Sequence, residues 1–497
     1  MRYRFVLLIV LLSGAFFSCK SWMTVERSDD AGKNSHIKAD KVSRQVKPSE
    51  LVRMRPDRFV RGKMTFAAPV DPSIIQGALD NGVHYYLANP SSGTTGNTLA
   101  LVVRHGSAHE PAAYPGLAHV LAHVMEDNYH RIISGDSGPF THVSYDALQC
   151  LTSYKSKREA ENILHFLHLI ASDLPLETAT IDRAKREAIH CSIHPGTTQD
   201  SLIARTLYQG SPYASHLPYY RHSSIRTIPD DTIRQHYKAW FSPGNIAIMA
   251  IGSFSRYEMV ESLQNNFKMD AHRPTLLSPS KPHIPFHTKP RIRSIIDPEA
   301  APGIQIIQFR PQIKHNTFYG YIKTIQWDFF EYLWLEEIKK VLPSGANPSI
   351  HFDKGVDGLD QCVIQIEVPQ NGEIENALRQ VFSVQRKIQK EGFPQEKFDT
   401  LKSYFLSDKK ARLFDKNRAS GRIMAYRLAR HFLTGEAVPD AAQAWSAIEG
   451  SVLPLSPKEM QGLAKIWLTK RNRTILVRGP KDSLPAESAL QQLANEQ

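Results

Sequence analysis

The sequence contains few cysteines and, beyond its N-terminal segment, no long apolar run. Four cysteines in 497 residues argue against a disulfide scaffold, and we expect Cys150, Cys191 and Cys362 to be buried free thiols. After the first few dozen residues, no stretch stays apolar for the roughly 20 residues that a membrane-spanning helix needs. The length is also too great for one ordinary hydrophobic core, so we expect two domains.

Compact basic tracts are also missing, although the chain is basic overall. It has 61 Lys and Arg against 49 Asp and Glu, a formal charge of +12. This excess is compatible with acidic partners such as anionic lipid headgroups or nucleic acid. However, the basic residues are scattered, and no nucleic-acid-binding motif is present. We interpret the charge as a solvated surface and expect no nucleic-acid partner.

The N-terminus has the layout of a secretory signal peptide over residues 1–19. Arg2 and Arg4 supply positive charge, residues 5–12 form an apolar run, and small residues lead to Cys19. A cysteine at the cleavage point resembles a bacterial lipobox, which predicts lipidation of Cys19 and an outer-membrane or periplasm-facing lipoprotein. The alternative is an ordinary signal peptide with a chance cysteine and secretion to the periplasm. Both place the protein in a bacterial cell envelope.

The remaining chain divides into four parts by composition and periodicity. Residues 20–62 are polar and non-periodic, which is typical of a flexible tether. Residues 63–270 and 291–490 each mix strands with helices, and residues 271–290 are rich in Pro, His, Ser and Lys, as linkers often are. The two larger parts have similar lengths and element orders. We therefore predict an α+β fold with two homologous domains, each a mostly antiparallel sheet packed with helices.

Individual elements follow from hydrophobic spacing and turn residues. The Asn81-Gly82 pair predicts a hairpin whose partner strand is residues 99–106. Period-3.6 patterns predict helices and short apolar runs predict strands. The expected helices are 117–126, 157–173, 181–193, about 257–267, about 321–341, 374–391 and 395–432, and the further strands are 246–252, 303–309, 361–368 and 473–480.

Two histidines at helical spacing carry the clearest chemical signal. His119 and His123 are four residues apart, so they share one face of the predicted helix and are able to bind one Zn²⁺ ion. They follow the segment Arg104–Glu110. Together these residues resemble the signature of the pitrilysin/insulinase peptidases, in which Arg-x-Gly-Ser-x-x-Glu precedes a helix with His-x-x-Glu-His. The resemblance extends over about residues 65–485.

Two catalytic positions of that signature are changed. The family's general base, a glutamate that takes the proton of zinc-bound water, corresponds to Ala122. The family's third zinc ligand, a glutamate on a later helix, corresponds to Ser192, in a segment that begins with Lys185. Catalytic zinc normally has three protein ligands. We therefore expect no catalytic residue and no cofactor, with His119 and His123 as a vestigial metal pair.

An alternative metal site remains open. Glu126 lies on the same helical face as the two histidines and is a possible substitute ligand. Zinc is expected only if this carboxylate rescues the site. In that case the chain is a weak or unorthodox zinc metalloendopeptidase acting on peptides.

The resemblance also implies an assembly. Complete chambers in this family need four such domains, and this chain supplies two, so a homodimer or a heterodimer with an active half-length peptidase is expected. The favoured hypothesis is a catalytically deficient, envelope-anchored subunit that binds substrate peptides or a peptidase partner, attached to the membrane through an N-terminal lipid. The other alternative is a purely structural scaffold lipoprotein.

Overall fold

A computed structural model of the chain describes most of its two domains. The described residues are 66–89, 96–133, 139–191, 197–218, 223–267, 283–311, 313–354, 356, 359–369, 374–414 and 420–495. Several predicted features lie outside the described residues: the signal peptide with Cys19, the tether over residues 20–62, and Ser192. Residues 268–282, around the predicted linker, also lie outside them. The domain boundaries at 271–290 therefore stay predictions.

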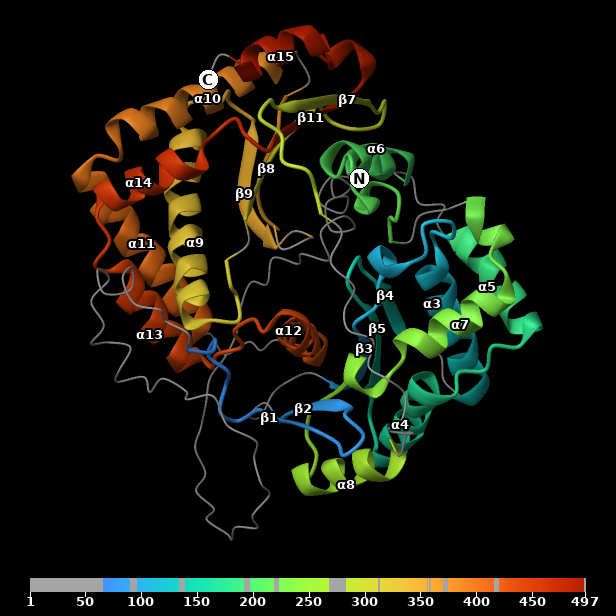
Figure 1. Ribbon diagram of the computed structural model, residues 1–497. Helices are drawn as coiled ribbons and strands as arrows, with labels where there is room; N and C mark the ends of the chain where they lie inside the picture. Colours follow the sequence, from blue (N-terminus) through green and yellow to red (C-terminus); the bar gives the residue numbers. More distant parts are fainter. Residues whose placement is uncertain are drawn as a thin grey trace.

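The first unit is a six-stranded sheet with helices on one side (Figure 1). Its strands lie in the order β1-β2-β6-β3-β5-β4, and all neighbours are antiparallel except β2 and β6. The strands are β1 (Ile75–Ala78), β2 (His84–Ala88), β3 (Asn97–Val103), β4 (Phe140–Val143), β5 (Leu148–Tyr154) and β6 (Ile246–Ile251). The helices are α3 (Leu117–Ile132), α4 (Lys157–Ser172), α5 (Thr178–Cys191), α6 (Thr197–Leu207), α7 (Asp230–Trp240) and α8 (Arg256–Asn266).

The second unit repeats this plan with five strands. Their order, β7-β11-β8-β10-β9, matches the order β2-β6-β3-β5-β4 of the first unit. The strands are β7 (Arg291–Ile296), β8 (Gly303–Pro311), β9 (Asn347–Lys354), β10 (Leu359–Glu367) and β11 (Arg473–Gly479). The helices are α9 (Phe318–Lys339), α10 (Ile374–Glu391), α11 (Gln395–Leu413), α12 (Gly421–Thr434), α13 (Ala441–Val452), α14 (Pro457–Trp467) and α15 (Glu487–Asn495). The chain thus has an α+β fold of two homologous units.

Two local predictions are wrong. The Asn81-Gly82 turn does join a hairpin, but the hairpin is β1–β2, and β6 lies between β2 and β3. The predicted helix over 395–432 is two helices, because α11 ends at Leu413 and the hydroxyl of Ser420 caps a new helix, accepting from the Ile423 amide. Periodicity alone does not show a strand inserted from far along the chain or a break between two helices of similar polarity.

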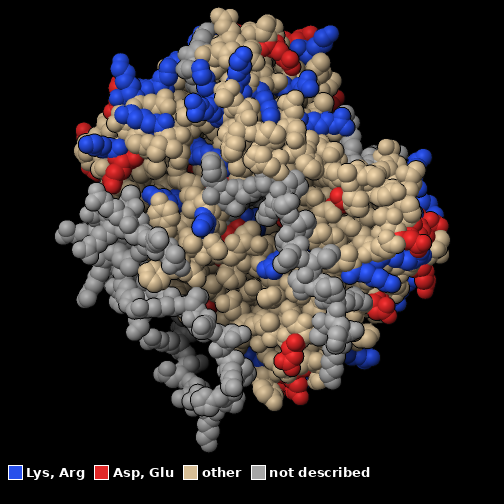
Figure 2. All heavy atoms as spheres, in the orientation of Figure 1, with Lys and Arg blue, Asp and Glu red and all other residues tan. Residues whose placement is uncertain are grey.

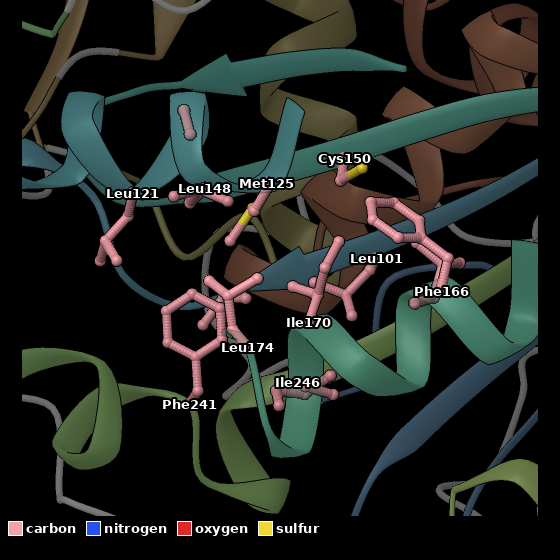
Figure 3. Packing of buried hydrophobic residues seen from close by; sticks show 14 of the residues in the cluster. Leu101, Leu121, Met125, Leu148, Cys150, Phe166, Ile170, Leu174, Phe241 and Ile246 are labelled. Carbon is pink, nitrogen blue, oxygen red and sulfur yellow. The ribbon is translucent and has the colours of Figure 1, made fainter. Parts of the chain in front are cut away.

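The core of the first unit lies between the sheet and its helices (Figure 3). Leu121 and Met125 of α3 and Phe166 and Ile170 of α4 are each four residues apart, so each pair points inward from one helical face. They pack with residues such as Leu101 of β3. Each fully buried side chain of this kind contributes about 1.5–3 kcal/mol relative to exposure. This core fixes the orientation of α3.

The outer face of each sheet is covered by a helix of the other unit. Leu428 and Phe432 of α12 are buried against the first sheet, and α12 lies across the first unit in Figure 1. Reciprocally, Leu207 of α6 and the following Tyr208 are buried against the second sheet. The guanidinium of Arg104 also donates to the Phe432 carbonyl at 2.6 Å and stacks over its ring. The two units are therefore interlocked rather than joined by the linker alone.

Within the described residues, every helix is too short or too polar to cross a lipid bilayer. Cys150 and Cys362 are buried free thiols, as expected, on the corresponding strands β5 and β10.

Candidate functional site

Two glycines and a buried carboxylate position the start of α3. Gly106 lies against the turn that joins β4 and β5, where a side chain would collide with the Ser144 carbonyl. Gly116 has φ 98°, a left-handed conformation that favours glycine, and it is the N-cap of α3. The Glu110 carboxylate accepts from the amides of Gly116 and Ala118, both at 2.7 Å. Burial raises the pKa of Glu110 to about 8, although those two amides act to lower it.

His119 and His123 face each other on α3. Their Nε2 atoms are 3.1 Å apart, and His119 is 1% exposed. Two nitrogens that ligate one tetrahedral zinc ion at 2.0–2.1 Å are separated by roughly 3.3 Å. The two rings therefore present the nitrogens that a metal pair would use, at close to the required separation.

Glu126 contacts the other ring nitrogen of His123. Its Oε2 lies 3.0 Å from Nδ1 of His123, and the Thr141 hydroxyl of β4 donates to its Oε1. Burial acts to raise the pKa of Glu126, but the hydrogen bonds from His123 and Thr141 outweigh it and hold the pKa below its ordinary value. A carboxylate on Nδ1 fixes the tautomer in which the Nε2 lone pair is available. Glu126 is thus placed to orient His123, and direct metal ligation would require its carboxylate to move.

The other catalytic positions of the signature offer no metal donor where the structure describes them. Ala122 is buried at 1% exposure and ends in a methyl group. Lys185 of α5 forms an ion pair with Asp230 of α7 at 2.8 Å, which ties these two helices together. Ser192 follows the end of α5, outside the described residues.

The donor set does not complete a catalytic zinc site. Among the described residues, no three His, Cys, Asp or Glu side chains converge in a way that would hold a metal ion. Two imidazoles without a third ligand and without a neighbouring general base do not fit the zinc chemistry of a hydrolase. Among the described residues, the geometry orients a histidine pair, and the side chain at the position of the general base is the methyl group of Ala122.

A second histidine pair lies beside the first motif, and sequence patterns did not indicate it. His105 is fully buried, and its Nε2 is 3.1 Å from Nε2 of His236 on α7. The His105 ring stacks on Trp240, and the His109 ring also lies against Trp240. Because 131 residues separate His105 from His236, no local spacing relates them.

This second pair makes stability dependent on pH. Burial, with His109 nearby, lowers the pKa of His236 to about 4, and burial lowers the pKa of His105 in the same direction. The pKa of His236 in the folded protein thus lies below 6.5, the ordinary value for histidine. Its contribution is fully present above pH 6.5 and is lost as the pH falls towards 4, by about 3 kcal/mol at most. We expect urea midpoints to fall over this range, and to fall less in His236→Gln than in wild type. Urea midpoints that fall equally with pH in wild type and in His236→Gln would contradict this expectation. The control is His190→Gln, which replaces an exposed histidine.

The edge of the first sheet lies next to the α3 histidines. β4 is the outermost strand, so one of its sides has no partner strand within the described sheet. Phe140 is 45% exposed, and the guanidinium of Arg422 from α12 lies 4.8 Å above its ring. Thr141, the next residue, is the one that donates to Glu126. The edge strand, the second unit and the histidine pair therefore meet at one place.

Comparisons with known proteins agree with the fold described above. Residues 227–405 match the family model described as the peptidase M16 inactive domain. A protein of Arabidopsis thaliana named zinc protease PQQL-like is 26% identical over 259 residues, which is 47% of this chain and 26% of that protein. The first half of the periplasmic protease PqqL from Escherichia coli has a TM-score of 0.77 at 16% identity, covering 86% of this chain and 97% of that structure. A predicted insulinase family protease from Yersinia pestis has a TM-score of 0.70 at 19% identity, with 86% and 97% covered. The chain is thus similar to insulinase-family proteases in its fold, and residues 227–405 match the family's inactive-domain model.

The family match has definite limits. The chain spans less than half the length of the curated relatives it matches. At 16% and 19% identity, the matches to solved structures concern the fold. The inactive-domain match begins at residue 227, after α3, so it concerns the end of the first unit and part of the second. The inactive-domain match therefore does not include α3 or its two histidines.

Proposed function

We propose that this chain is a catalytically deficient member of the insulinase family that binds peptides or a peptidase partner. The observation that carries the proposal is the α3 site: two facing histidines, with the buried methyl group of Ala122 at the position of the general base. General-base catalysis contributes about two to four orders of magnitude to such reactions. This site lacks the general base, and serine replaces the glutamate that is the third zinc ligand. We therefore expect it to bind a peptide without hydrolysing it.

Peptide binding is supported by the edge strand β4. An extended peptide is able to add to an exposed sheet edge through main-chain hydrogen bonds, with side-chain pockets supplying specificity. The exposed Phe140 and the Arg422 guanidinium above it offer an apolar and a cationic contact at this edge. Such a peptide would run beside Thr141 and the histidine pair. This is a binding arrangement that does not need the missing carboxylates.

A partner and an envelope location are part of the same proposal. The chain matches one half of PqqL, a protease described as periplasmic. We therefore propose that this two-domain chain pairs with a second copy or with an active half-length peptidase. Lipidation at Cys19 would hold the pair at the outer membrane. The alternative is a structural scaffold that binds no peptide. This alternative predicts no saturable peptide binding, and therefore no effect of β4 substitutions on it.

The test is metal analysis and peptide turnover on the purified chain, together with peptide binding. We expect substoichiometric zinc, background turnover that does not respond to a chelator, and saturable binding of a mixed peptide library that Phe140→Ser weakens. Tyr257→Ser, which removes another exposed aromatic side chain far from β4, is the matched control. Stoichiometric zinc with efficient, chelator-sensitive cleavage would show instead an unorthodox peptidase using His119, His123 and Glu126.

A further inference from the structure

The fold gathers basic side chains that are scattered in the sequence. Figure 2 shows Lys and Arg concentrated over the part of the second unit where Figure 1 places α10 and α14. The exposed basic residues of this face, named here the α10–α14 surface, are Arg386, Lys387, Lys390, Lys465, Lys470 and Arg471. The exposed acidic residues of the two helices are Glu391, at the end of α10, and Glu459, in the first turn of α14. A strong excess of positive charge therefore remains on this surface.

The two helices that carry four of these residues are fixed side by side, and Lys470 and Arg471 lie between the end of α14 and β11. The Gln389 amide of α10 donates to the carbonyls of Ala464 and Leu468, at 3.4 and 2.8 Å. In return, the Gln461 amide of α14 donates to the carbonyls of Gln389 and Lys390, at 3.1 and 2.9 Å. Lys465 lies one turn after Gln461 on α14. The basic residues of the two helices thus belong to one rigid surface.

These cations differ from those on the neighbouring helix α11. On α11 four of the five basic side chains pair with carboxylates, whereas the six residues of the α10–α14 surface form no ion pair within the described part of the chain. The ion pairs of α11 are Lys397–Glu337, Lys402–Asp399, Lys409–Asp328 and Arg412–Asp408. The charge of the α10–α14 surface is therefore available to an external anion.

An apolar side chain stands among these cations. Ile466 is 70% exposed, directly after Lys465 and four residues before Lys470. A single exposed isoleucine is normal on a protein surface. Among cations, however, it suits a membrane surface. The cations attract anionic headgroups, and burial of the isoleucine side chain at the acyl boundary is favourable.

We propose that the α10–α14 surface docks on a lipid bilayer containing anionic phospholipids, with Ile466 inserted between headgroups. The surface is built from two adjacent helices rather than from a groove, so it fits a flat partner better than a peptide or a folded domain. The aromatic side chains of α10 and α14, Phe382 and Trp467, are buried, so these two helices offer single-stranded nucleic acid no ring for stacking. The contact is independent of the α3 histidines and would set the orientation of the chain on a membrane.

The test compares vesicle binding by two variants with the same change of charge. The first carries Lys387→Gln, Lys390→Gln, Lys465→Gln and Arg471→Gln on the α10–α14 surface. The control carries four charge-removing changes at exposed positions of the first unit, and an Ile466→Ser variant probes the apolar contact. The control changes are Lys155→Gln, Arg158→Gln, Arg226→Gln and Lys238→Gln. Every full-length protein, including the reference, carries Cys19→Ser so that no acyl chain is attached.

Binding is measured by co-sedimentation with vesicles of phosphatidylcholine alone and of phosphatidylcholine with one third phosphatidylglycerol. We expect the reference protein to prefer the anionic vesicles. The surface variant should lose on the order of a thousandfold in partition coefficient, since it lacks four charges and each Lys or Arg near such a surface contributes about 1 kcal/mol. The control variant should lose far less, and Ile466→Ser should weaken binding at high salt as well. Thermal unfolding checks that every variant is folded.

Three outcomes would overturn the proposal. Equal losses in the two four-site variants would mean that overall charge, not this surface, drives binding. Equal affinity of the reference protein for both vesicle types would remove the electrostatic contact. Binding to polyglutamate or single-stranded DNA without binding to anionic vesicles would assign the surface to an acidic macromolecule. None of these outcomes depends on peptide turnover, so they leave the proposed function untouched.

Discussion

Replacing two residues should convert the α3 site into a zinc-binding peptidase site. In the double variant Ala122→Glu, Ser192→Glu, we expect close to one zinc ion per chain and peptide turnover at least about a hundredfold above wild type, the lower end of what a general base contributes. The physical reason is that His119 and His123 already face each other at 3.1 Å and that Glu126 already orients His123. The two substitutions add the glutamates that the pitrilysin/insulinase signature has at these two positions, a proton acceptor and a third ligand.

The second readout of this variant is stability, which separates metal binding from catalysis. Ala122 is 1% exposed, so a carboxylate there should destabilise the metal-free protein. Zinc should restore that stability, by about 2.7 kcal/mol when free zinc is a hundred times its dissociation constant. The matched control is Ala122→Gln, Ser192→Gln, which has nearly the same shape without the charge. If the control binds and cleaves as well as the carboxylate pair, proton transfer is not what the wild-type site lacks.

The fold was predictable to the level of its repeated units. Short apolar runs located β6 and β11, and these two strands do occupy equivalent positions in the two sheets. The exchange of α6 and α12 between the units was not predictable. Leu428 and Phe432 give α12 an apolar face, but periodicity does not say which of two sheets that face will cover. Such long-range choices depend on shape and packing rather than on local spacing.

The candidate site was predictable where its members are neighbours in sequence. The four-residue spacing placed His119 and His123 on one helical face, and their rings do meet. The same spacing placed Glu126 on that face, yet spacing does not tell which nitrogen of His123 a carboxylate will reach. The Glu126 carboxylate is also held from a separate strand, β4, because the Thr141 hydroxyl donates to it. The spacing of residues along one helix does not predict contacts with a residue on another element.

A methyl group at Gly106 should be among the most destabilising single changes in the first unit. An alanine Cβ there would lie 2.3 Å from the Ser144 carbonyl oxygen and 2.6 Å from the Ala147 amide nitrogen, both backbone atoms that have no free rotation. To make room, the segment would have to leave the β4–β5 turn, to which the Ser107 amide is hydrogen-bonded at 3.0 Å. We expect Gly106→Ala to lower the free energy of unfolding by about 3 kcal/mol, measured by urea denaturation.

The contrasting glycine is Gly462, and comparison with it isolates the steric cause. Gly462 lies inside α14, and a Cβ added there meets no atom within 4 Å. Gly462→Ala should therefore stabilise the protein by up to about 1 kcal/mol, because alanine favours the helix and loses less conformational entropy on folding. If both substitutions shift the urea midpoint in the same direction, the close approach at Gly106 is not what holds the segment before α3. In that case the placement of Glu110 at the helix start, and with it the register of the histidine pair, must depend on other contacts.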